Sequence, residues 1–320
     1  MNKAVGFLFA IYVLAMAAIA FSERSDPPMP PTEVRIENQL MLDAVMVEGR
    51  IVAVGERGRI FVSDDSGRVW RAAAVEGEAT LTAVARVEGD TLVAVGHDAA
   101  IQRSTDRGAT WVRVHEDSEA EEPLLAVRFD GDGRGIAVGA YGRFMESGDG
   151  GQSWVERELN GLDFHFNAIT ASGDVLILAG EAGSLLRSED GGETWEELDP
   201  PYEGSFFGAL ALPDEAVLIF GMRGNLFRSD DVGDTWEELE TASQASLFGG
   251  RVLADGRVAL VGQSGALVMS DDGGRSFRSL AGAKRLVRSA VVDVGDDELL
   301  LIGEEGFERI RLSSLREETD

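Results

Sequence analysis

The chain of 320 residues contains no cysteine, which excludes a disulfide framework, thiol catalysis and a cysteine-ligated metal. Histidine is almost as scarce. His97, His115 and His165 stand at no HxH or HExxH spacing, so we expect neither a metal site nor a cofactor. Proline is also rare, with eight residues against 39 glycines. That balance is typical of a folded, turn-rich β protein rather than of a disordered chain.

Positive charge is in short supply. The 29 lysines and arginines are outnumbered by 57 aspartates and glutamates, so the formal net charge is −28. A surface of that sign repels phosphate backbones, and nucleic acid is therefore not an expected partner. The acidic surface is better suited to keeping the protein soluble.

The longest apolar run lies at the N-terminus. It covers the 18 residues 4–21 after Lys3, and "AIA" at 18–20 offers a small-residue cleavage site. Residues 1–21 are therefore interpreted either as a cleaved signal peptide or as an uncleaved membrane anchor. Both alternatives place the body of the chain outside the cytoplasm, in the periplasm. Residues 22–32 form a proline-rich linker.

One sequence word recurs six times in the rest of the chain. Its pattern is S-x-D-x-G-x-x-W, as in "SEDGGETW" at 188–195, and we call each copy a box. The final aromatic residues are 41 residues apart, except for one spacing of 43. A fixed period slightly above 40 is typical of β-propeller blades. The box residues are Asp65, Asp106, Asp149, Asp190, Asp231 and Asp272, with Trp70, Trp111, Trp154, Trp195, Trp236 and Phe277.

A second landmark supplies a seventh repeat. An apolar run ending in G-x-x-G precedes each box, with Ala99 in place of the second glycine in the second copy, and occurs once more at 300–306, where no box follows. Within one period, 124–164, four strand-like segments alternate with turns, which predicts a blade of four antiparallel strands. We therefore predict an all-β, seven-bladed propeller over residues 33–314 with a polar tail at 315–320. The strand-like 32–38 is expected to complete the seventh blade, whose repeat holds only three strands.

The box falls between the third and fourth predicted strands, where a hairpin turn is expected. Its aspartate and serine can cap backbone amides, its glycine can adopt positive φ, and its aromatic residue can pack inward. The alternative is a calcium loop, which requires D-x-D-x-D-G and a distant glutamate, and no copy has this arrangement. Six regular copies favour a shared structural role, so the box aspartates are interpreted as turn residues.

The box is the Asp-box, or bacterial neuraminidase repeat, of sialidases, some other glycoside hydrolases and sortilin-type receptors. With its G-x-x-G run, as in "LLAVRFDGDGRGIAVGAYGRFMESGDGGQSWVERE" at 124–158, the repeat most resembles the photosystem II stability/assembly factor family of seven-bladed propellers. The resemblance covers about residues 33–310. It implies a non-enzymatic, extracytoplasmic propeller that helps to assemble a membrane complex, with a transporter as one candidate client. The family's arginine patch cannot be mapped onto this acidic chain.

Two classes of function remain open. A monomeric binding or assembly module that contacts a membrane protein is favoured, because no catalytic set stands out. The alternative is a glycoside hydrolase, since sialidases also carry Asp-boxes. The Arg-Ile-Pro word that accompanies the sialidase site is absent, and beyond the N-terminal segment only Tyr141 and Tyr202 could act as a tyrosine nucleophile. We therefore predict no catalytic residue and no enzyme.

The predicted binding face carries the G-x-x-G turns and the connections between blades. The two residues inside each G-x-x-G differ from blade to blade while the frame repeats, as on a binding face built on a scaffold, or as in unconstrained loops. Three groups of candidates follow. They are the turn residues Arg57, His97, Tyr141 and Arg223, the basic residues Lys284, Arg285 and Arg288, and the aromatic residues Phe164, Tyr202 and Phe206.

The two smaller groups also have plainer interpretations. The basic residues can bind an acidic partner or simply balance local charge. Phe164, Tyr202 and Phe206 are expected to form an exposed apolar lip, whereas Phe166, Phe207 and Phe248, spaced by 41, are expected to pack between blades.

Overall fold

The computed structural model describes residues 6–9, 11–13, 16, 36, 38–117, 119, 122–159 and 161–317. The chain divides into two compact units, Met1–Val34 and Arg35–Asp320. In the first unit, residues 6–9, 11–13 and 16 are helical, and no helix among the described residues is long and apolar enough to cross a membrane. The linker predicted at 22–32 lies outside the described residues.

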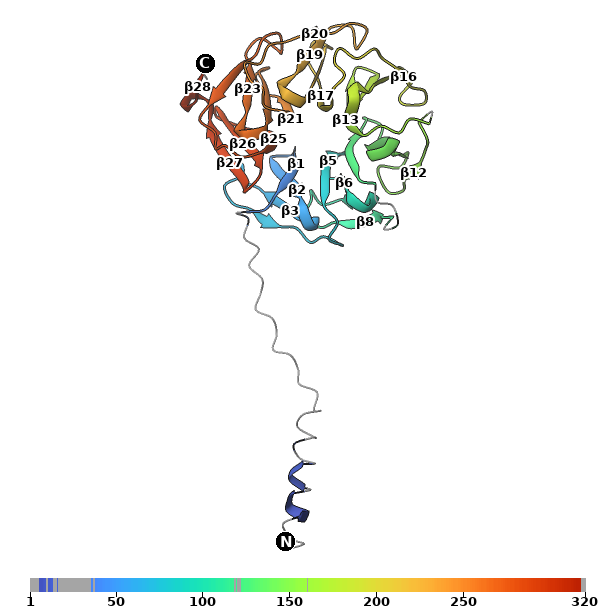
Figure 1. Ribbon diagram of the computed structural model, residues 1–320, viewed down its shortest axis with the longest axis vertical. Helices are drawn as coiled ribbons and strands as arrows, with labels where there is room; N and C mark the ends of the chain where they lie inside the picture. The colour runs from blue at the N-terminus through green and yellow to red at the C-terminus, as the bar shows by residue number, and fades with distance from the viewer. Residues whose placement is uncertain are drawn as a thin grey trace. The chain divides into compact units, whose positions relative to one another are not determined.

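The second unit is a ring of seven antiparallel sheets, which confirms the predicted seven-bladed propeller (Figure 1). In the first four blades, successive strands along the chain are neighbours in the sheet. Those strands are β1 (Met41–Val47), β2 (Arg50–Gly55), β3 (Ile60–Ser63) and β4 (Arg71–Ala72); β5 (Leu81–Arg86), β6 (Leu92–Gly96), β7 (Ile101–Ser104) and β8 (Val112–His115); β9 (Leu124–Phe129), β10 (Gly135–Gly139), β11 (Phe144–Ser147) and β12 (Val155–Glu156); β13 (Phe166–Ser172), β14 (Val175–Gly180), β15 (Leu185–Ser188) and β16 (Glu196–Glu197).

The last three blades follow the same order with differences at the C-terminus. Blade seven has three strands among the described residues, and the final strand of the chain pairs with blade six instead. The strands are β17 (Phe206–Ala211), β18 (Val217–Gly221), β19 (Leu226–Ser229) and β20 (Glu237–Glu238); β21 (Leu247–Val252), β22 (Val258–Gly262), β23 (Leu267–Ser270), β24 (Arg278–Ala281) and β28 (Arg316–Glu317); β25 (Arg288–Gly295), β26 (Glu298–Gly303) and β27 (Gly306–Arg311).

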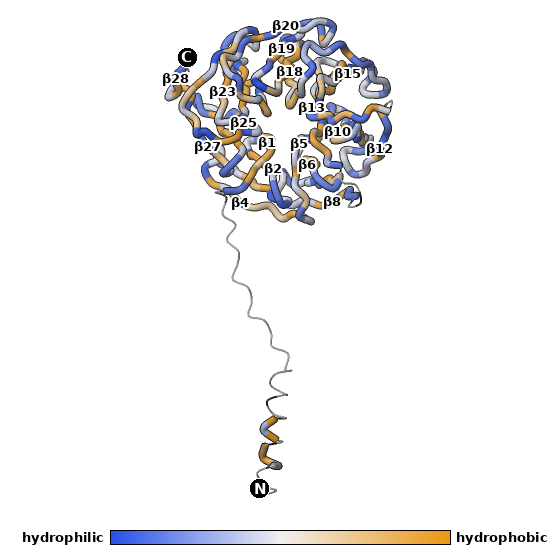
Figure 2. The backbone as a smooth tube through the Cα atoms, viewed as in Figure 1, coloured by the Kyte–Doolittle hydropathy of each residue, from blue (hydrophilic) through white to orange (hydrophobic). Residues whose placement is uncertain are grey.

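The second strand of each blade forms the core. β10 and β18, for example, are buried at every residue, because each second strand packs against the blades on both of its faces. Their valine, leucine, isoleucine and alanine runs are what a strand buried on both faces requires. Figure 2 shows the hydrophobic residues gathered along these inner strands.

The first strand of each blade is the innermost one. The first glycine of each G-x-x-G, at the end of the second strand, pairs with the first residue of that innermost strand. The glycine is needed because the backbones approach closely: an added Cβ on Gly96 would lie 1.9 Å from the Thr80 carbonyl oxygen. The residue that it faces is a core position, which we call the frame position. Its occupants are Met41, Leu81, Leu124, Phe166, Phe206, Leu247 and Arg288.

This register corrects two predictions. Phe206, predicted to be an exposed lip residue, is a frame residue that is fully buried. Phe207 and Phe248, predicted to pack between blades like Phe166, instead follow the frame position. The reason is that the innermost strands of blades four and five begin 40 residues apart, so a spacing of 41 from Phe166 passes the frame by one residue.

Blades one and seven meet through side chains. The Ser289 hydroxyl donates to the Met41 carbonyl at 2.8 Å, and the ring of Phe307 on β27 stacks on Trp70 at 3.7 Å. The fourth strand of blade seven, predicted at 32–38, falls largely outside the described residues. Ile36, which is described, lies beside Gly306 at the position that the inter-blade connections occupy beside the equivalent glycines of other blades.

Each box is the turn between the third and fourth strands, as predicted. In the copy at 188–195, the Ser188 hydroxyl donates to Asp190 Oδ1 and accepts from the Gly192 amide, both at 2.8 Å. Asp190 in turn accepts the Thr194 amide at 2.9 Å. The indole nitrogen of Trp195 donates to the Gly192 carbonyl at 3.0 Å while its ring packs into the core. Equivalent serine and aspartate bonds close the other five boxes.

Candidate functional site

The turns inside the G-x-x-G motifs lie at the end of the blades opposite the boxes, together with the connections from one blade to the next. We call this end of the propeller the loop face. In blades one to six each turn is a short 3-10 helix, and all six have the same geometry. They are η1 (Glu56–Gly58), η2 (His97–Ala99), η3 (Ala140–Gly142), η4 (Glu181–Gly183), η5 (Met222–Gly224) and η6 (Gln263–Gly265).

The middle residue of every turn adopts the left-handed conformation, with φ between 51° and 59°. Blade seven repeats this at Glu305, with φ of 59°. None of the seven residues is glycine, although that conformation costs other residues roughly 1 kcal/mol or more and clusters at functional sites. They are Arg57, Asp98, Tyr141, Ala182, Arg223, Ser264 and Glu305.

The backbone of each turn is held in place while its side chains vary. The amide that follows the first glycine donates to the carbonyl just before the innermost strand, as from His97 to Thr80 at 2.8 Å and from Glu181 to His165 at 2.9 Å. The same bond occurs in all seven blades. The loop face is therefore a ring of backbone turns, each held by the same hydrogen bond, whose side chains vary around the ring.

The four predicted turn residues all lie on this ring. Arg57, Tyr141 and Arg223 are exposed and occupy the left-handed position. His97 is exposed one residue earlier, beside the left-handed Asp98. These residues belong to blades one, two, three and five, so the ring brings them onto one face but spreads them around it.

The predicted basic patch loses one member. Lys284 and Arg285 are exposed in the connection before β25, but Arg288 is buried, with an exposed fraction of 1 %. Arg288 occupies the frame position of blade seven, and its guanidinium forms an ion pair with Glu308 on β27. Burial lowers the pKa of Arg288 below its ordinary value. The patch available to a partner is therefore Lys284 with Arg285.

The predicted aromatic lip also loses a member. Phe164 is 37 % exposed, whereas Phe206 is buried at the frame position. Tyr202 is half-buried and stacks on Phe227, with ring centroids 6.4 Å apart. Tyr141, which lies on the turn ring as predicted, also reaches this region, because its ring meets His165 edge-on with ring centroids 4.5 Å apart.

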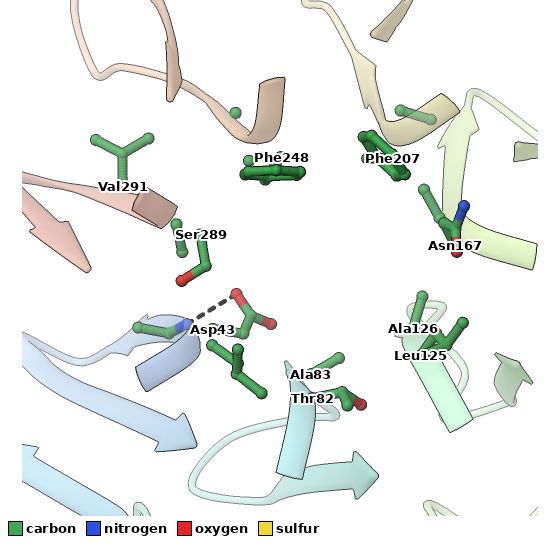
Figure 3. A pocket seen from close by; sticks show the side chains of 18 of the residues that line it. Asp43, Thr82, Ala83, Leu125, Ala126, Asn167, Phe207, Phe248, Ser289 and Val291 are labelled. Carbon is green, nitrogen blue, oxygen red and sulfur yellow. Dashed lines mark hydrogen bonds between the residues drawn. The ribbon is translucent and has the colours of Figure 1, made fainter. Parts of the chain in front are cut away.

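A central cavity of about 550 Å³ lies among the innermost strands (Figure 3). One part of its wall is aromatic, since the rings of Phe207 and Phe248 lie 5.3 Å apart. Another part of the wall is polar, and its side chains form hydrogen bonds with neighbouring blades. Thr82 donates to the Leu124 carbonyl at 2.7 Å, and Asn167 donates to the Phe206 carbonyl at 2.8 Å.

Asp43 is the acidic group of this cavity. Its carboxylate accepts the Ala44 amide at 2.7 Å and the Val84 amide of blade two at 2.9 Å. Burial raises the pKa of Asp43 to about 6, and the amides and the positive charge of Arg251 oppose that rise only partly. Arg251 lines the same cavity, and its guanidinium makes no hydrogen bond or ion pair with the rest of the described chain.

Sequence reasoning missed both charged residues of the cavity. In the other blades the position of Asp43 holds a small residue, alanine or glycine, as at Ala83, Ala126 and Gly208. Aligning the repeats on the first glycine of G-x-x-G sets Asp43 one residue past these counterparts, against Val84 and Val127, but still shows a carboxylate among apolar residues. Arg251 gave no such signal, since Arg128 stands at the same place in blade three.

The box carboxylates are engaged in their own turns. The hydroxyl and amide of Ser153 lower the pKa of Asp149 to about 2, and those of Thr194 do the same for Asp190. Within the described ranges, no group of three histidine, aspartate or glutamate side chains is arranged to hold a metal ion. The serine and aspartate side chains of the boxes therefore stabilise the turns in which they lie.

These features define a seven-bladed β-propeller with a regular box face, a variable loop face and a polar–aromatic central cavity. The family model described as Photosynthesis system II assembly factor YCF48 matches residues 111–257, which confirms the resemblance inferred from the repeats. No curated protein matches the sequence.

Solved structures support the same architecture. The structure titled "YCF48 bound to D1 peptide" superposes with a TM-score of 0.70 at 18% identity, covering 89% of this chain and 95% of that one. YCF48 from Cyanidioschyzon merolae gives a TM-score of 0.67 at 15% identity, covering 85% and 94%. A xyloglucanase from Xanthomonas campestris also matches, with a TM-score of 0.69 at 15% identity, but this chain spans only 53% of it. At these identities the likeness establishes the fold.

Proposed function

We propose that this propeller is a non-enzymatic assembly or accessory factor that binds a membrane protein complex, a transporter being one candidate, on the outer side of the cytoplasmic membrane. The observation that carries the proposal is the loop face. Each of the seven turns presents one residue in the left-handed conformation, and these residues are of six different types. That arrangement suits recognition of another protein, because the scaffold stays constant while the contacts vary.

The comparisons support the same class of function. The matching family is named for an assembly factor, and one similar structure is titled as bound to a peptide of D1. Binding of a protein segment is therefore the activity that we transfer to this chain. The export signal predicted at residues 1–21 is the reason for placing that activity outside the cytoplasm.

The hydrolase alternative has less support. Neither Tyr141 nor Tyr202 makes a hydrogen bond to a carboxylate or guanidinium in the described part of the chain, as a tyrosine nucleophile with its paired acid would. The xyloglucanase shares the fold, and shared fold does not carry shared chemistry. Evidence for a hydrolase would be the release of sugar from a glycan.

The test is crosslinking of the full chain to its client in membranes from the source cells, followed by purification and identification. We expect one membrane protein at a stoichiometric ratio. A double variant of the loop face, Lys284→Glu with Arg285→Glu, should reduce its recovery, while Glu237→Lys on the outer strand β20 serves as a charge-changing control. Recovery of no membrane protein, together with release of sugar from a glycan panel, would replace this proposal with the hydrolase.

A further inference from the structure

A small apolar pocket opens on the loop face of blade four. We call it the blade-four pocket, and its volume is about 150 Å³. It lies between the connection that enters blade four, the turn η4 and the connection that leaves for blade five. Its accessible wall consists of Leu162, Phe164, Ala182, Ser184, Leu198 and Pro200.

The pocket is open to solvent at its rim and closed at its base. Phe164 is 37 % exposed, and Ala182 and Pro200 are also exposed. At the base, Phe166 and Leu186 belong to the core cluster of blades three and four. A cavity of about 150 Å³ with apolar walls is large enough to hold a benzene-sized group, so this pocket accepts one aliphatic or small aromatic side chain.

One polar atom in the wall has no partner. The Ser184 hydroxyl is buried and makes no hydrogen bond with the rest of the described chain. Buried hydroxyl groups are normally paired, because leaving one unpaired is unfavourable. Because the chain covers this hydroxyl, it does not contact a segment that enters the pocket from the rim.

The surroundings of the pocket are acidic. Glu197 lines it, and Asp163 is exposed in the connection beside Phe164. The adjoining hollow, which shares Leu162, is lined by Glu122, Glu156 and Glu158. Its arginines are already engaged, since Arg143 pairs with both Glu122 and Glu156, at 3.5 and 3.6 Å.

We propose that the blade-four pocket binds an extended protein segment in which one aliphatic side chain, inserted beside Phe164, is flanked by lysine or arginine residues. The apolar walls select the inserted side chain, and the surrounding carboxylates select its basic neighbours. This inference rests on the proposed function. It specifies which side chains of the client contact one place on the loop face.

The probe is a fluorescein-labelled peptide with a central leucine, glycine–serine spacers and two lysines at each end, followed by fluorescence polarisation with the full chain. Replacing the leucine by alanine should weaken binding about tenfold, because most of an aliphatic side chain leaves the pocket. Replacing the lysines by glutamates should abolish binding at low salt. No saturable binding of the leucine peptide up to about 1 mM would overturn the proposal.

Variants of the protein locate the site. Phe164→Ala should weaken binding of the leucine peptide about fivefold to tenfold. Glu197→Lys should weaken it about twofold to fivefold, and more at low salt than at high salt. The matched control is Glu238→Lys, at the same position of the equivalent strand β20 in blade five, and it should leave binding unchanged. Equal weakening by both glutamate variants would mean that the peptide senses only net charge, which contradicts the proposal.

The same variants separate this inference from the proposed function. If Phe164→Ala and Glu197→Lys leave crosslinking to the membrane client intact, the blade-four pocket is not the docking point, while the assembly role stands. If the peptide binds at the pocket but no membrane client is recovered, the pocket is real and the assembly role fails. Thermal unfolding of each variant shows that the loss of binding is not loss of fold.

Discussion

The two ends of this propeller are built by opposite rules. On the box face, six turns use the same serine, aspartate and glycine in the same hydrogen bonds, and their aromatic residues reach the core. On the loop face, the turn of every blade donates the same backbone amide hydrogen bond, while the residue at its left-handed position varies. The side chains of the box face stabilise their own turns, whereas the turn side chains of the loop face are available for other contacts.

The comparison explains why only one end is a candidate site. A box side chain that faced a partner would have to leave its own turn, since both oxygens of Asp190 already accept hydrogen bonds from Thr194. A loop-face side chain such as Tyr141, which is 61 % exposed, has no such engagement and can change without unfolding a blade. Side chains that stabilise their own turns and side chains that are free to contact a partner therefore lie at opposite ends of the propeller.

The largest expected effect comes from removing one aromatic side chain at each end of blade four. Trp195→Ala should lower the free energy of unfolding by about 3–5 kcal/mol, because the indole fills the core beside Phe144. Phe164→Ala, on the loop face, should lower it by about 1 kcal/mol or less, since the ring is partly exposed. Urea unfolding measures both, and equal losses would contradict the division between the two ends.

A second test uses two aspartates whose pKa values are shifted in opposite directions. The pKa of Asp43 is raised to about 6, so its folded-state carboxyl prefers the proton and the protein loses stability as pH rises from about 4 to 7. Relative to Asp43→Asn, that loss should approach about 3 kcal/mol. The pKa of Asp190 is lowered to about 2, so its contribution is present above pH 4 and is lost as pH falls toward 2.

The pH dependence of each difference is the measurement. The unfolding free energy of the wild type minus that of Asp43→Asn should fall between pH 4 and 7, and the corresponding difference for Asp190→Asn should fall between pH 4 and 2. A flat profile for Asp43 in the first interval would show that its carboxylate is better solvated than its burial indicates.

Two serines four residues apart on blade four give a closely matched pair. Ser188→Ala should cost about 1–3 kcal/mol, because the Gly192 amide and Asp190 both lose their bond to its hydroxyl. Ser184→Ala should be neutral or slightly stabilising, since its buried hydroxyl has no partner among the described residues. Thermal unfolding compares them, and a destabilised Ser184→Ala would reveal a structural role on the loop face.

The smallest expected effect concerns the one turn that departs from G-x-x-G. Ala99 takes the place of the second glycine with φ of 45°, a conformation that an alanine adopts only with strain. Ala99→Gly should therefore stabilise the protein by about 0.5–1 kcal/mol. A chemical unfolding curve checks this, and Gly183→Ala in blade four is the reverse change, which should destabilise more because its Cβ would lie 2.6 Å from the Tyr202 carbonyl oxygen.

Much of the fold was predictable from local repetition. The boxes and the G-x-x-G runs located every blade, because a turn or a close backbone approach demands particular residues wherever it occurs. The same reasoning failed at Phe206, Phe207 and Arg288. A count of 41 residues cannot detect that one connection is a residue shorter, and an arginine in a basic cluster looks exposed until its partner, Glu308, is seen on another strand.

The sequence by itself determined the number of blades, the strand order and the box turns, since these depend on residues close together in the chain. Only the tertiary structure decided which side chains meet across blades. It brought Asp43 and Arg251 into one central cavity, buried Arg288 against Glu308, and joined Phe164, Ser184 and Pro200 into the blade-four pocket. The reason is physical: burial and charge pairing depend on distances between residues that the chain separates and the closed ring brings together.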